Sequence, residues 1–402
     1  MTENKITNRN AGDLDTSTMH INMGPSHPAM HGVINIKVDI DGEKVVNAKL
    51  DIGYLHRGFE KSAENKTYKQ VIPYTDRLNY VSPLLNNFGY TLAVEKLLGI
   101  DVPRRTKFIR VIMGELSRLT DHLTCNAAIM MENGGFTPFL YYMKAREMLF
   151  ALIEKVTGAR LTVNYSRIGG LRNDLPDGFK EETLSILDKI QEILDDVEKM
   201  VMRNRIFMDR WKGTGILSRE DAIAWNITGP VGRASGFDYD VRRDHPYFVY
   251  DELEFDVPIG KYGDTFDRVL VREEEMRQSM SIIRQALDLI PKGPIMVDDP
   301  RVSMPKKTKV YNTIEGMITN FKLIIEGVKV PKGEIYSFTE AGNGELGYYI
   351  VSDGSGKPYR VRLKPPCFYN TQALAEMIKG NTIADIIPVF GSINMIAGEL
   401  DR

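Results

Sequence analysis

The sequence is poor in cysteine, and this limits the redox chemistry that the chain can carry by itself. Only Cys125 and Cys367 occur in 402 residues, far apart and without a Cys-x-x-Cys pair. A disulfide framework is therefore not expected, which fits a reducing compartment. An iron–sulfur cluster usually needs four thiolates, and a structural zinc site needs several closely spaced Cys or His ligands. If the chain takes part in redox chemistry, we expect another chain to hold the electron carrier.

Two further absences exclude classes of partner. The formal charge is −2, so no basic excess indicates binding to nucleic acid. No apolar run approaches the roughly 18 residues that a membrane-spanning helix needs. The polar segment 1–16 also lacks the apolar stretch of a secretion signal. We expect a soluble chain that reaches a membrane only through partners, with a flexible N-terminal tail over residues 1–18.

Long segments with helical periodicity dominate the remainder. Phe179–Asn204 repeats apolar residues at helical spacing, with Glu, Asp and Lys between them. Thr137-Pro138 is typical of a helix cap followed by a first-turn proline, and Gly158 predicts the end of that helix. The other predicted helices are Leu84–Leu98, Arg105–Met131, with an apolar stripe at Val111, Leu116, Leu119 and Leu123, and Phe266–Ile290.

A β-hairpin is predicted near the N-terminus, over about residues 33–50. Apolar and polar residues alternate there, and Asp41-Gly42 supplies the turn. No β-α-β-α alternation indicates a doubly wound sheet. We therefore predict a mainly α, α+β fold, with a large helical core and small antiparallel β elements. No repeat, low-complexity tract or linker divides the chain, which predicts a single domain over residues 19–402.

Gly342-Asn-Gly-Glu-Leu-Gly347 fits the G-x-G-x-x-G pattern of dinucleotide-binding proteins. That pattern binds a pyrophosphate only between a strand and a following helix. Here Tyr348-Tyr-Ile-Val351 and a Gly/Ser-rich turn follow, which is typical of strands. We interpret the glycines as hairpin residues and do not expect this chain to bind NAD.

His27 and His31 form an H-x-x-x-H pair. On a helix this spacing would place both imidazoles on one face for a metal, but Pro28 lies between them and Pro25 and Gly32 indicate a loop. Three interpretations remain open at this point. The histidines bind zinc, bond to the loop backbone, or line a pocket.

Several long blocks of sequence resemble one known family, the 49-kDa (D) subunit of respiratory complex I. The blocks are Gly24-Pro-Ser-His-Pro-Ala-Met-His-Gly32, Ile52-Gly-Tyr-Leu-His-Arg-Gly-Phe-Glu-Lys61, Pro73-Tyr-Thr-Asp-Arg-Leu-Asn-Tyr80, Arg110-Val-Ile-Met-Gly-Glu-Leu-Ser-Arg118, Asn164-Tyr-Ser-Arg-Ile-Gly-Gly170, Ala234-Ser-Gly-Phe-Asp-Tyr-Asp-Val-Arg242, Gly344-Glu-Leu-Gly-Tyr-Tyr-Ile-Val-Ser-Asp-Gly354 and Asp401-Arg402. They follow in order across nearly the whole chain. A series of this length is far more specific than any single short motif.

The same family is similar to the large subunit of nickel–iron hydrogenases, which implies a hydrogenase-like fold. The Arg-Gly-x-Glu stretch of those enzymes is present as Arg57-Gly-Phe-Glu60. Their four metal-binding cysteines fall at positions occupied here by Asn79, Ser82, Ile396 and Glu399. Nickel and iron in that site need the soft thiolate ligands. The resemblance therefore implies the former metal pocket without its metal, and it argues against a working hydrogenase.

In complex I this cavity binds the quinone headgroup, and the family's histidine and tyrosine ligands correspond to His31 and Tyr80. An imidazole and a phenol can donate protons to a quinone that accepts two electrons and two protons. Glu132 stands where the family usually has Asp, and it is expected to bond to His31 or to a water. Arg57, Asp76 and Arg77 are expected in the cavity wall, with His56 beside them or as filling.

The resemblance also implies how the chain works with others. It would form the quinone-reduction cavity of a proton-pumping NADH:quinone oxidoreductase, with a 4Fe–4S cluster held by a neighbouring small subunit and NAD bound elsewhere in the complex. Further implied partners are the 30-kDa subunit, a ferredoxin-like subunit and the membrane subunit that forms the quinone channel. A related complex with another electron donor and a non-catalytic assembly scaffold are the alternatives. The lack of a transit-peptide pattern favours the cytoplasmic side of a bacterial inner membrane, with peripheral attachment.

Overall fold

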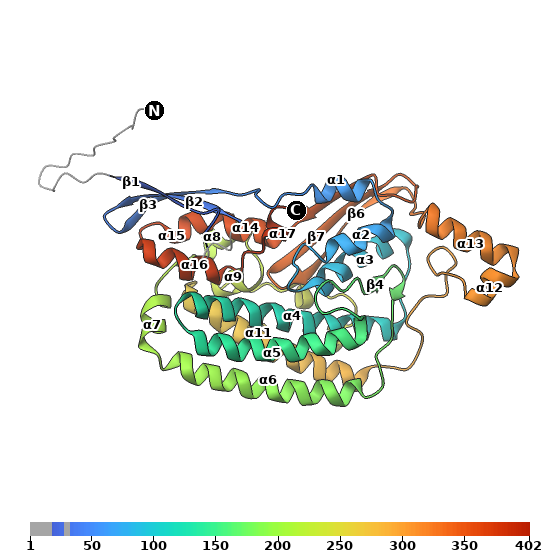
Figure 1. Ribbon diagram of the computed structural model, residues 1–402, viewed down its shortest axis with the longest axis horizontal. Helices are drawn as coiled ribbons and strands as arrows, with labels where there is room; N and C mark the ends of the chain where they lie inside the picture. The colour runs from blue at the N-terminus through green and yellow to red at the C-terminus, as the bar shows by residue number, and fades with distance from the viewer. Residues whose placement is uncertain (1–17, 28–32) are drawn as a thin grey trace, which may run out of the picture.

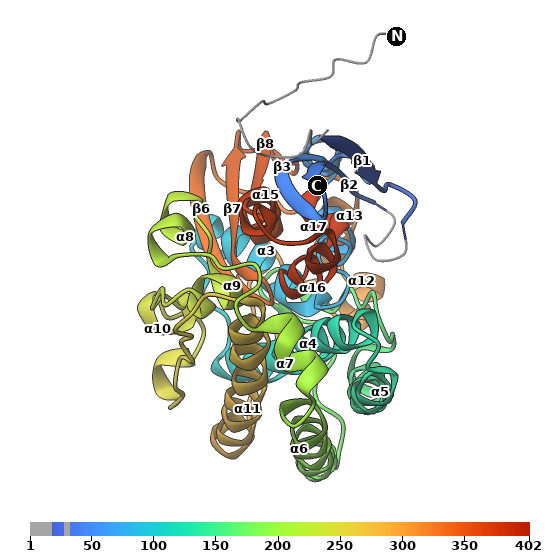
Figure 2. The same ribbon diagram turned by 90° about the vertical axis from the view of Figure 1, so that its left-hand side faces the viewer.

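The computed structural model describes residues 18–27 and 33–402, and it is mainly helical. Four long helices pack together as a bundle, and the small sheets lie beside and above them (Figures 1 and 2). These helices are α4 (Arg104–Glu132), α5 (Phe136–Thr157), α6 (Phe179–Met202) and α11 (Thr265–Leu289). The predicted α+β, mainly α fold is confirmed.

The predicted long helices are all present, and their ends lie close to the predicted residues. The cap predicted for α5 is wrong, because the helix starts one residue before Thr137 and Gly135 is its N-cap. A turn at Gly134, with φ of 85°, follows α4 directly and allows the next helix to begin early. The C-terminal prediction is confirmed, since Gly158 adopts φ of 80° and its N–H donates to Glu154 O at 2.8 Å.

Helix α4 is buried on nearly every side, because α3 (Pro83–Leu98), α5, α11 and α16 (Ile386–Ser392) pack against it. The sequence indicated only one apolar stripe on this helix. Its polar side chains are buried as well, and each needs a partner to offset the loss of water. The buried polar residues that organise the interior are Arg110, Glu115, Arg118, Asp121, His122 and Asn126.

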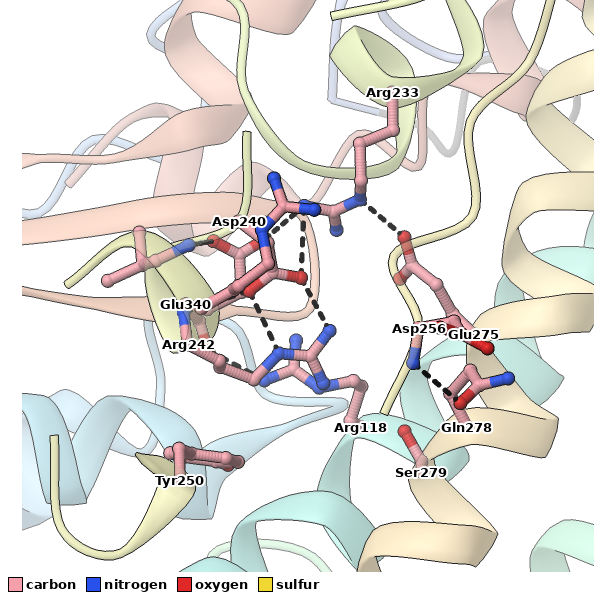
Figure 3. A network of polar contacts seen from close by, with 12 residues as sticks. Arg118, Arg233, Asp240, Arg242, Tyr250, Asp256, Glu275, Gln278, Ser279 and Glu340 are labelled. Carbon is pink, nitrogen blue, oxygen red and sulfur yellow. Dashed lines mark hydrogen bonds and ion pairs between the residues drawn. The ribbon is translucent and has the colours of Figure 1, made fainter. Parts of the chain in front are cut away.

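A network of buried ion pairs joins α11 to the segments around the sheet (Figure 3). Arg233 of α9 (Gly229–Ala234) donates from Nε to Glu275 Oε1 of α11 at 2.7 Å. The same guanidinium donates from Nη1 to Glu340 Oε1 of β6 (Gly333–Ala341) at 2.9 Å. Arg242 of α10 (Val241–Asp244) pairs with Asp240 at 2.7 Å. These five residues are at most 2% exposed, so the pairs lie in a low-dielectric interior.

Glu115 of α4 is a second centre of this network. It accepts hydrogen bonds from Arg118 Nε at 3.1 Å and Arg242 Nη1 at 3.2 Å. Two hydroxyls complete the shell, Tyr250 Oη at 2.6 Å and Ser279 Oγ at 2.7 Å. Burial by itself would raise the pKa of Glu115, but the two guanidiniums and the hydroxyls hold it at about 2. The carboxylate is therefore ionised and ties the segment of Tyr250 and Arg242 to the bundle.

The predicted N-terminal hairpin is present as β2 (Asn35–Asp41) and β3 (Lys44–Asp51), which pair antiparallel across a turn at Gly42 and Glu43, one residue later than the predicted Asp41-Gly42. A third strand, β1 (Met19–Met23), pairs with β2 at the edge of this sheet. The sequence analysis did not predict β1, because this short strand is mostly exposed and shows no sustained apolar alternation. The predicted division into a tail, residues 1–18, and one domain, residues 19–402, stays a prediction.

The second three-stranded sheet has the order β6-β7-β8, with β7 (Gly344–Ser352) between β6 and β8 (Arg360–Lys364). Gly342 and Asn343 form the turn between β6 and β7, so the element directly after them is a strand and not a helix. The interpretation of the G-x-G-x-x-G segment as hairpin glycines is confirmed.

Shorter elements complete the described chain. They are α1 (Phe59–Glu64), α2 (Tyr68–Thr75), α3 (Pro83–Leu98), β4 (Ser166–Arg167), β5 (Gly170–Leu171), α7 (Arg205–Trp211), α8 (Arg219–Ala224), η2 (Tyr250–Glu252), α12 (Lys307–Asn312), α13 (Ile314–Ile325), α14 (Pro366–Gln372), α15 (Leu374–Ile378), η3 (Ile383–Asp385) and α17 (Ala397–Leu400). The N-terminal sheet and the C-terminal helices share one apolar core, and α1–α3 pack with β6–β8 in another. Among the described helices, none combines the length and the apolar run that crossing a bilayer requires.

Candidate functional site

Two distant segments meet where the resemblance to hydrogenases places the lost metal. One is the loop between α2 and α3, which contains Asn79 and Ser82, and the other is α17 near the C-terminus. Gly398 of α17 lies directly against this loop, so a Cβ at that position would overlap Arg77 O and reach within 2.7 Å of Leu78 O. The absence of a side chain at Gly398 allows this close approach.

Asp121 of α4 is the centre of the site and is fully buried. Its Oδ2 accepts hydrogen bonds from Asn79 Nδ2 at 3.0 Å and from Ser82 Oγ at 3.1 Å, while Oδ1 accepts from Asn394 Nδ2 at 3.1 Å. The β6–β7 turn closes over the same carboxylate, since a Cβ on Gly342 would overlap Asp121 Oδ2. Asp121 therefore joins the loop before α3, the C-terminal segment and the hairpin turn.

The hydrogen bonds continue from Asp121 to Glu399. Asn394 Nδ2 also donates to Asn343 Oδ1 at 2.5 Å, and Asn343 Nδ2 donates to Cys367 Sγ at 3.2 Å. The backbone N–H of Cys367 then donates to Glu399 Oε1 at 3.0 Å. Hydrogen bonds, with Cys367 as one link, thus connect the loop of Asn79 and Ser82 to α17.

The side chains here are suited to hydrogen bonding and not to binding nickel and iron. An amide, a hydroxyl, an alkyl group and a carboxyl group occupy the four positions that the resemblance to hydrogenases matches to metal-binding thiolates. Cys367 is the one thiol near them, and burial together with the Glu399 carboxylate raises its pKa well above the ordinary value. Within residues 18–27 and 33–402, no group of three or more His, Cys, Asp or Glu side chains is arranged to hold a metal ion.

Glu399 itself is fully buried in this chain of bonds. Burial raises the pKa of Glu399 to about 7. The charge of Asp121 also raises this pKa, whereas the hydrogen bond from the Cys367 N–H lowers it. The Glu399 carboxyl can therefore hold or release a proton near neutral pH.

Tyr80 projects from the buried loop beside this network. Its neighbours Asn79 and Val81 are buried, whereas Tyr80 is 39% exposed. Burial of the phenol raises the pKa of Tyr80, and the charges of Cys367 and Asp121 raise it further. Tyr80 is therefore a neutral phenol at neutral pH and can donate its proton to an acceptor outside the network.

Glu132, the last residue of α4, lies at the other end of the same helix face. A Cβ on Gly391 of α16 would lie 2.6 Å from Glu132 Oε2, so the carboxylate rests against a glycine. Eleven residues, about 16 Å of helix at 1.5 Å per residue, separate Glu132 from Asp121. Asp121 and Glu132 thus lie about three helical turns apart on one face of α4. His31 lies outside the described residues, so its predicted contact with Glu132 stays a prediction, as does the metal-binding alternative for His27 and His31.

The residues predicted for the cavity wall brace the loop that carries Tyr80. Arg57 Nη2 donates to Arg77 O at 2.7 Å, and Arg77 Nη1 donates to Pro73 O at 2.5 Å. Asp76 is fully buried and accepts from Asn87 Nδ2 at 2.6 Å and from the Asn164 N–H at 2.9 Å. Burial raises the pKa of Asp76 to about 6. Asp76 thus acts as an internal support for the loop.

The C-terminal Asp401 holds the segment around His56. Its carboxylate accepts the N–H groups of Gly53 and Leu55 at 2.9 and 2.7 Å, and its carbonyl oxygen lies 2.6 Å from His56 Nδ1. A pocket of about 440 Å³ lies next to these contacts and is lined by His56, Lys61, Phe368 and Asp401, among others. The Asp401-Arg402 end of the chain is therefore part of the structure around the site.

The sequence analysis missed Asp121, Asn343, Cys367 and Asn394 as site residues. A signal for Asp121 was present, because Asp121, Cys125 and Glu132 lie at positions i, i+4 and i+11 and so on one helix face. No comparable local pattern marks Asn343 or Asn394. Asn394 reaches Asp121 across 273 residues of sequence, and Asn343 joins the network through its bond with Asn394.

Comparison with known proteins identifies the family. Residues 132–402 match the family described as "Respiratory-chain NADH dehydrogenase, 49 Kd subunit". The chain is 55% identical over 391 residues to the first of the NADH-quinone oxidoreductase D subunits of Sorangium cellulosum (strain So ce56), covering 97% of each chain. It is 54% identical to the corresponding D subunit of Myxococcus xanthus (strain DK1622), covering 97% of this chain and 94% of that one.

The NADH-quinone oxidoreductase D subunit of Geobacter sulfurreducens (strain ATCC 51573 / DSM 12127 / PCA) is 50% identical over 387 residues, covering 96% of this chain and 99% of that one. The similarity thus extends along nearly the full length of this chain and of its relatives, and it agrees with the sequence blocks around the site. The chain belongs to the 49-kDa, or D, subunit family of NADH-quinone oxidoreductase, respiratory complex I.

Proposed function

We propose that this chain forms the quinone-binding and quinone-reduction cavity of a proton-translocating NADH:quinone oxidoreductase, together with a neighbouring subunit that holds a 4Fe–4S cluster. The observation that carries the proposal is the position of Tyr80. It is a neutral, partly exposed phenol on a loop that Asp121 fixes and whose other residues, apart from Arg77, are buried. A hydrogen-bond donor held in this way is preorganised for a quinone carbonyl on which negative charge develops.

The reaction balances with groups of this chain and electrons from the partner. The quinone accepts two electrons from the cluster and two protons, one from the Tyr80 phenol and one from the His31 imidazolium. The tyrosinate that remains takes up a proton from solvent, which the raised pKa of Tyr80 favours. Glu132 would hydrogen-bond to His31 and favour its charged form. NAD would bind to another subunit.

The partners follow from membership of a multi-subunit enzyme. Other complex I subunits assemble with this chain. We propose that these include the 4Fe–4S subunit, the 30-kDa subunit, a ferredoxin-like subunit and the membrane subunit with the quinone channel. The chain would lie at the cytoplasmic side of a bacterial inner membrane, attached through these partners.

The test compares two activities of membranes that carry Tyr80→Phe. We expect NADH oxidation with quinone to fall roughly 100-fold, the usual contribution of a general acid. Oxidation with an artificial acceptor that takes electrons upstream should stay unchanged. Tyr262→Phe is the matched control, because this phenol is 72% exposed and belongs to another part of the chain.

Each other outcome rejects the assignment. Full quinone activity in Tyr80→Phe would return Tyr80 to a packing role. Loss of both activities would indicate a role in assembly and support the scaffold alternative. Normal quinone reduction by a different electron donor, with no NADH activity in the unmodified membranes, would indicate the related complex.

We further propose that the loss of a proton from His31 changes the local charge and shifts nearby loops, which helps to couple quinone reduction to pumping. A His31→Ala enzyme should then translocate fewer protons per quinone reduced. The measurement is proton uptake by sealed vesicles at matched rates of electron transfer. An unchanged stoichiometry would show that His31 has no part in the coupling.

A further inference from the structure

The hairpin of α12 and α13 stands at the edge of the molecule, away from the helical bundle (Figure 1). Its residues contribute little to the interior. No residue of α12 is buried, and only Gly316 and Leu323 of α13 are. Helix α13 nevertheless has a defined start, because Thr313 is its N-cap and Thr313 Oγ1 accepts the N–H of Gly316 at 3.1 Å.

Helix α13 exposes the face that an amphipathic helix normally buries. Six large apolar side chains lie on one side of the helix, because each is three or four positions from another of the set. They are Ile314, Met317, Ile318, Phe321, Ile324 and Ile325, and between 45% and 69% of each is exposed. We call these six residues the α13 stripe. Apolar residues in such a row ordinarily face a core.

The other side of the hairpin faces the body across a groove whose lining is polar on the hairpin side and mixed on the body side. A cavity of about 730 Å³ separates α13 from the segment 296–306. Gly316, Thr319 and Glu315 line it from the hairpin, and Asp298 and Ser303 line it from the body. The hairpin thus turns small and polar residues toward its own chain and apolar residues away from it. This is the reverse of the orientation that would stabilise the isolated chain.

Positive charge flanks the α13 stripe. Lys307 and Lys322 are exposed and form no ion pair with any residue that the structure describes, whereas Lys309 lines the groove on the inner side of the hairpin. Glu326 at the end of the helix is already paired with Lys329 at 2.8 Å. Tyr311, which is 83% exposed, extends the apolar surface onto α12.

We propose that the α13 stripe is a docking helix, and that its occupant is an apolar groove with an acidic rim on another subunit of the complex. Family membership supplies the partners, since a chain of this family works within a multi-subunit enzyme. The six side chains have the spacing i, i+3, i+4 and i+7 at which a helix typically inserts apolar side chains into a groove of its partner. The unpaired lysines supply the charge that an acidic rim complements, which guides association and selects the partner.

The composition of the stripe favours a protein groove over a lipid surface. Four of its six residues are isoleucines, whose branched side chains have few rotamers in a helix and lose little entropy on docking. Helices that lie on membranes are typically rich in Trp, Phe and Leu, and the stripe contains one Phe and no Trp or Leu. The proposal concerns assembly and does not depend on the chemistry proposed for Tyr80.

The first test replaces the centre of the stripe within the whole enzyme. In Ile318→Glu/Phe321→Glu, two anchors become charges that an apolar groove with acidic neighbours excludes. We expect about tenfold less of this chain in intact complex on native gels, a change of about 1.4 kcal/mol in the assembly equilibrium. The matched control is Ile206→Glu/Ile223→Glu, because these isoleucines are 66% and 51% exposed and lie on other helices. Unchanged assembly in the stripe variant overturns the proposal.

A second measurement identifies the occupant even if a variant folds poorly. A photoreactive phenylalanine analogue at position 321 is activated in the assembled, active enzyme, and the product is analysed by mass spectrometry. A cross-link to one other subunit, at apolar residues flanked by Asp or Glu, supports the proposal. A cross-link to a second copy of this chain or to lipid overturns it, as does the absence of any cross-link. Lys307→Glu/Lys322→Glu should weaken assembly and make it less sensitive to salt. Unchanged salt dependence would contradict the acidic rim.

Discussion

Two isosteric substitutions in the buried ion-pair network should have opposite consequences. Glu115 accepts hydrogen bonds from two guanidiniums and two hydroxyls, so it is ionised in the folded chain. Glu340 accepts from Arg233 Nη1 at 2.9 Å and lies close to the Asp240 carboxylate. Burial, together with the charge of Asp240, raises the pKa of Glu340 to about 7 against the attraction of Arg233. Near neutral pH, Glu340 can therefore hold a proton where Glu115 cannot.

The two cases differ in what an amide does at each position. In Glu115→Gln the new NH₂ group faces donors, and the Arg118 and Arg242 guanidiniums lose the charge that offsets their burial. Breaking a buried ion pair in this way costs about 3–5 kcal/mol. In Glu340→Gln the amide resembles the protonated acid in shape and charge. Its oxygen still accepts from Arg233, and its NH₂ group replaces only the oxygen that accepts the long bond, 3.3 Å, from the Val241 N–H. The free energy of unfolding should therefore change by about 1 kcal/mol, less than in Glu115→Gln.

Thermal unfolding followed by circular dichroism measures both. An unfolding entropy of about 2.1 cal/mol/K per residue gives roughly 0.8 kcal/mol/K for this chain, so Glu115→Gln should lower Tm by about 4–6 °C. The sign of the pH effect gives a further check on Glu340. Its raised pKa means that stability falls as pH rises from about 4.5 toward 7. Glu340→Gln removes this loss, and at pH 8 it should be at least as stable as the unmodified chain.

The reasoning is refuted if Glu340→Gln destabilises the chain as much as Glu115→Gln does at pH 8. That result would mean that both carboxylates are ionised and that the neighbouring Asp240 does not influence Glu340. Equal and small effects would mean that the network is not held by charge.

Three further predictions concern the site and the acid limb of stability. Asp121→Ala removes the hydrogen-bond acceptor that Asn79 of the loop and Asn394 of the C-terminal segment share. Quinone reduction should therefore fall at least tenfold, while electron transfer to the upstream artificial acceptor is kept. An unaffected quinone rate would show that the network does not position the site. Gly398→Ala should weaken assembly and quinone reduction because its methyl group overlaps Arg77 O. Gly333→Ala, whose Cβ would meet only Leu97 Cδ2 at 4.0 Å, should be silent, and equal effects would exclude the packing explanation. The pKa of Glu115 is lowered, so its contribution to stability is full above pH 4.5 and is lost toward pH 2, and acid titration of Glu115→Gln should lack this step.

Much of the local structure was predictable because it follows from periodicity and turn chemistry. The repeat of 3.6 residues marked the long helices, and Asp41-Gly42 marked the hairpin. The strand pattern after Gly347 was enough to interpret the glycine motif as a turn. These signals are local, since each depends on residues within a few positions of one another. Strand β1 lacked such a signal, because an exposed edge strand needs no alternation of its own.

The sequence by itself also determined the family, through ordered blocks that run along nearly the whole chain, and it indicated Tyr80 as a candidate site residue. Only the tertiary structure decided that Asp121 connects Asn79 to Asn394, and that α4 buries charged residues in addition to its apolar stripe. It also decided that the α13 stripe faces outward, which spacing cannot distinguish from an inward-facing row. The physical reason is the same in each case. Partners for a buried charge or an apolar face come from residues far along the chain, and their selection depends on how the elements pack.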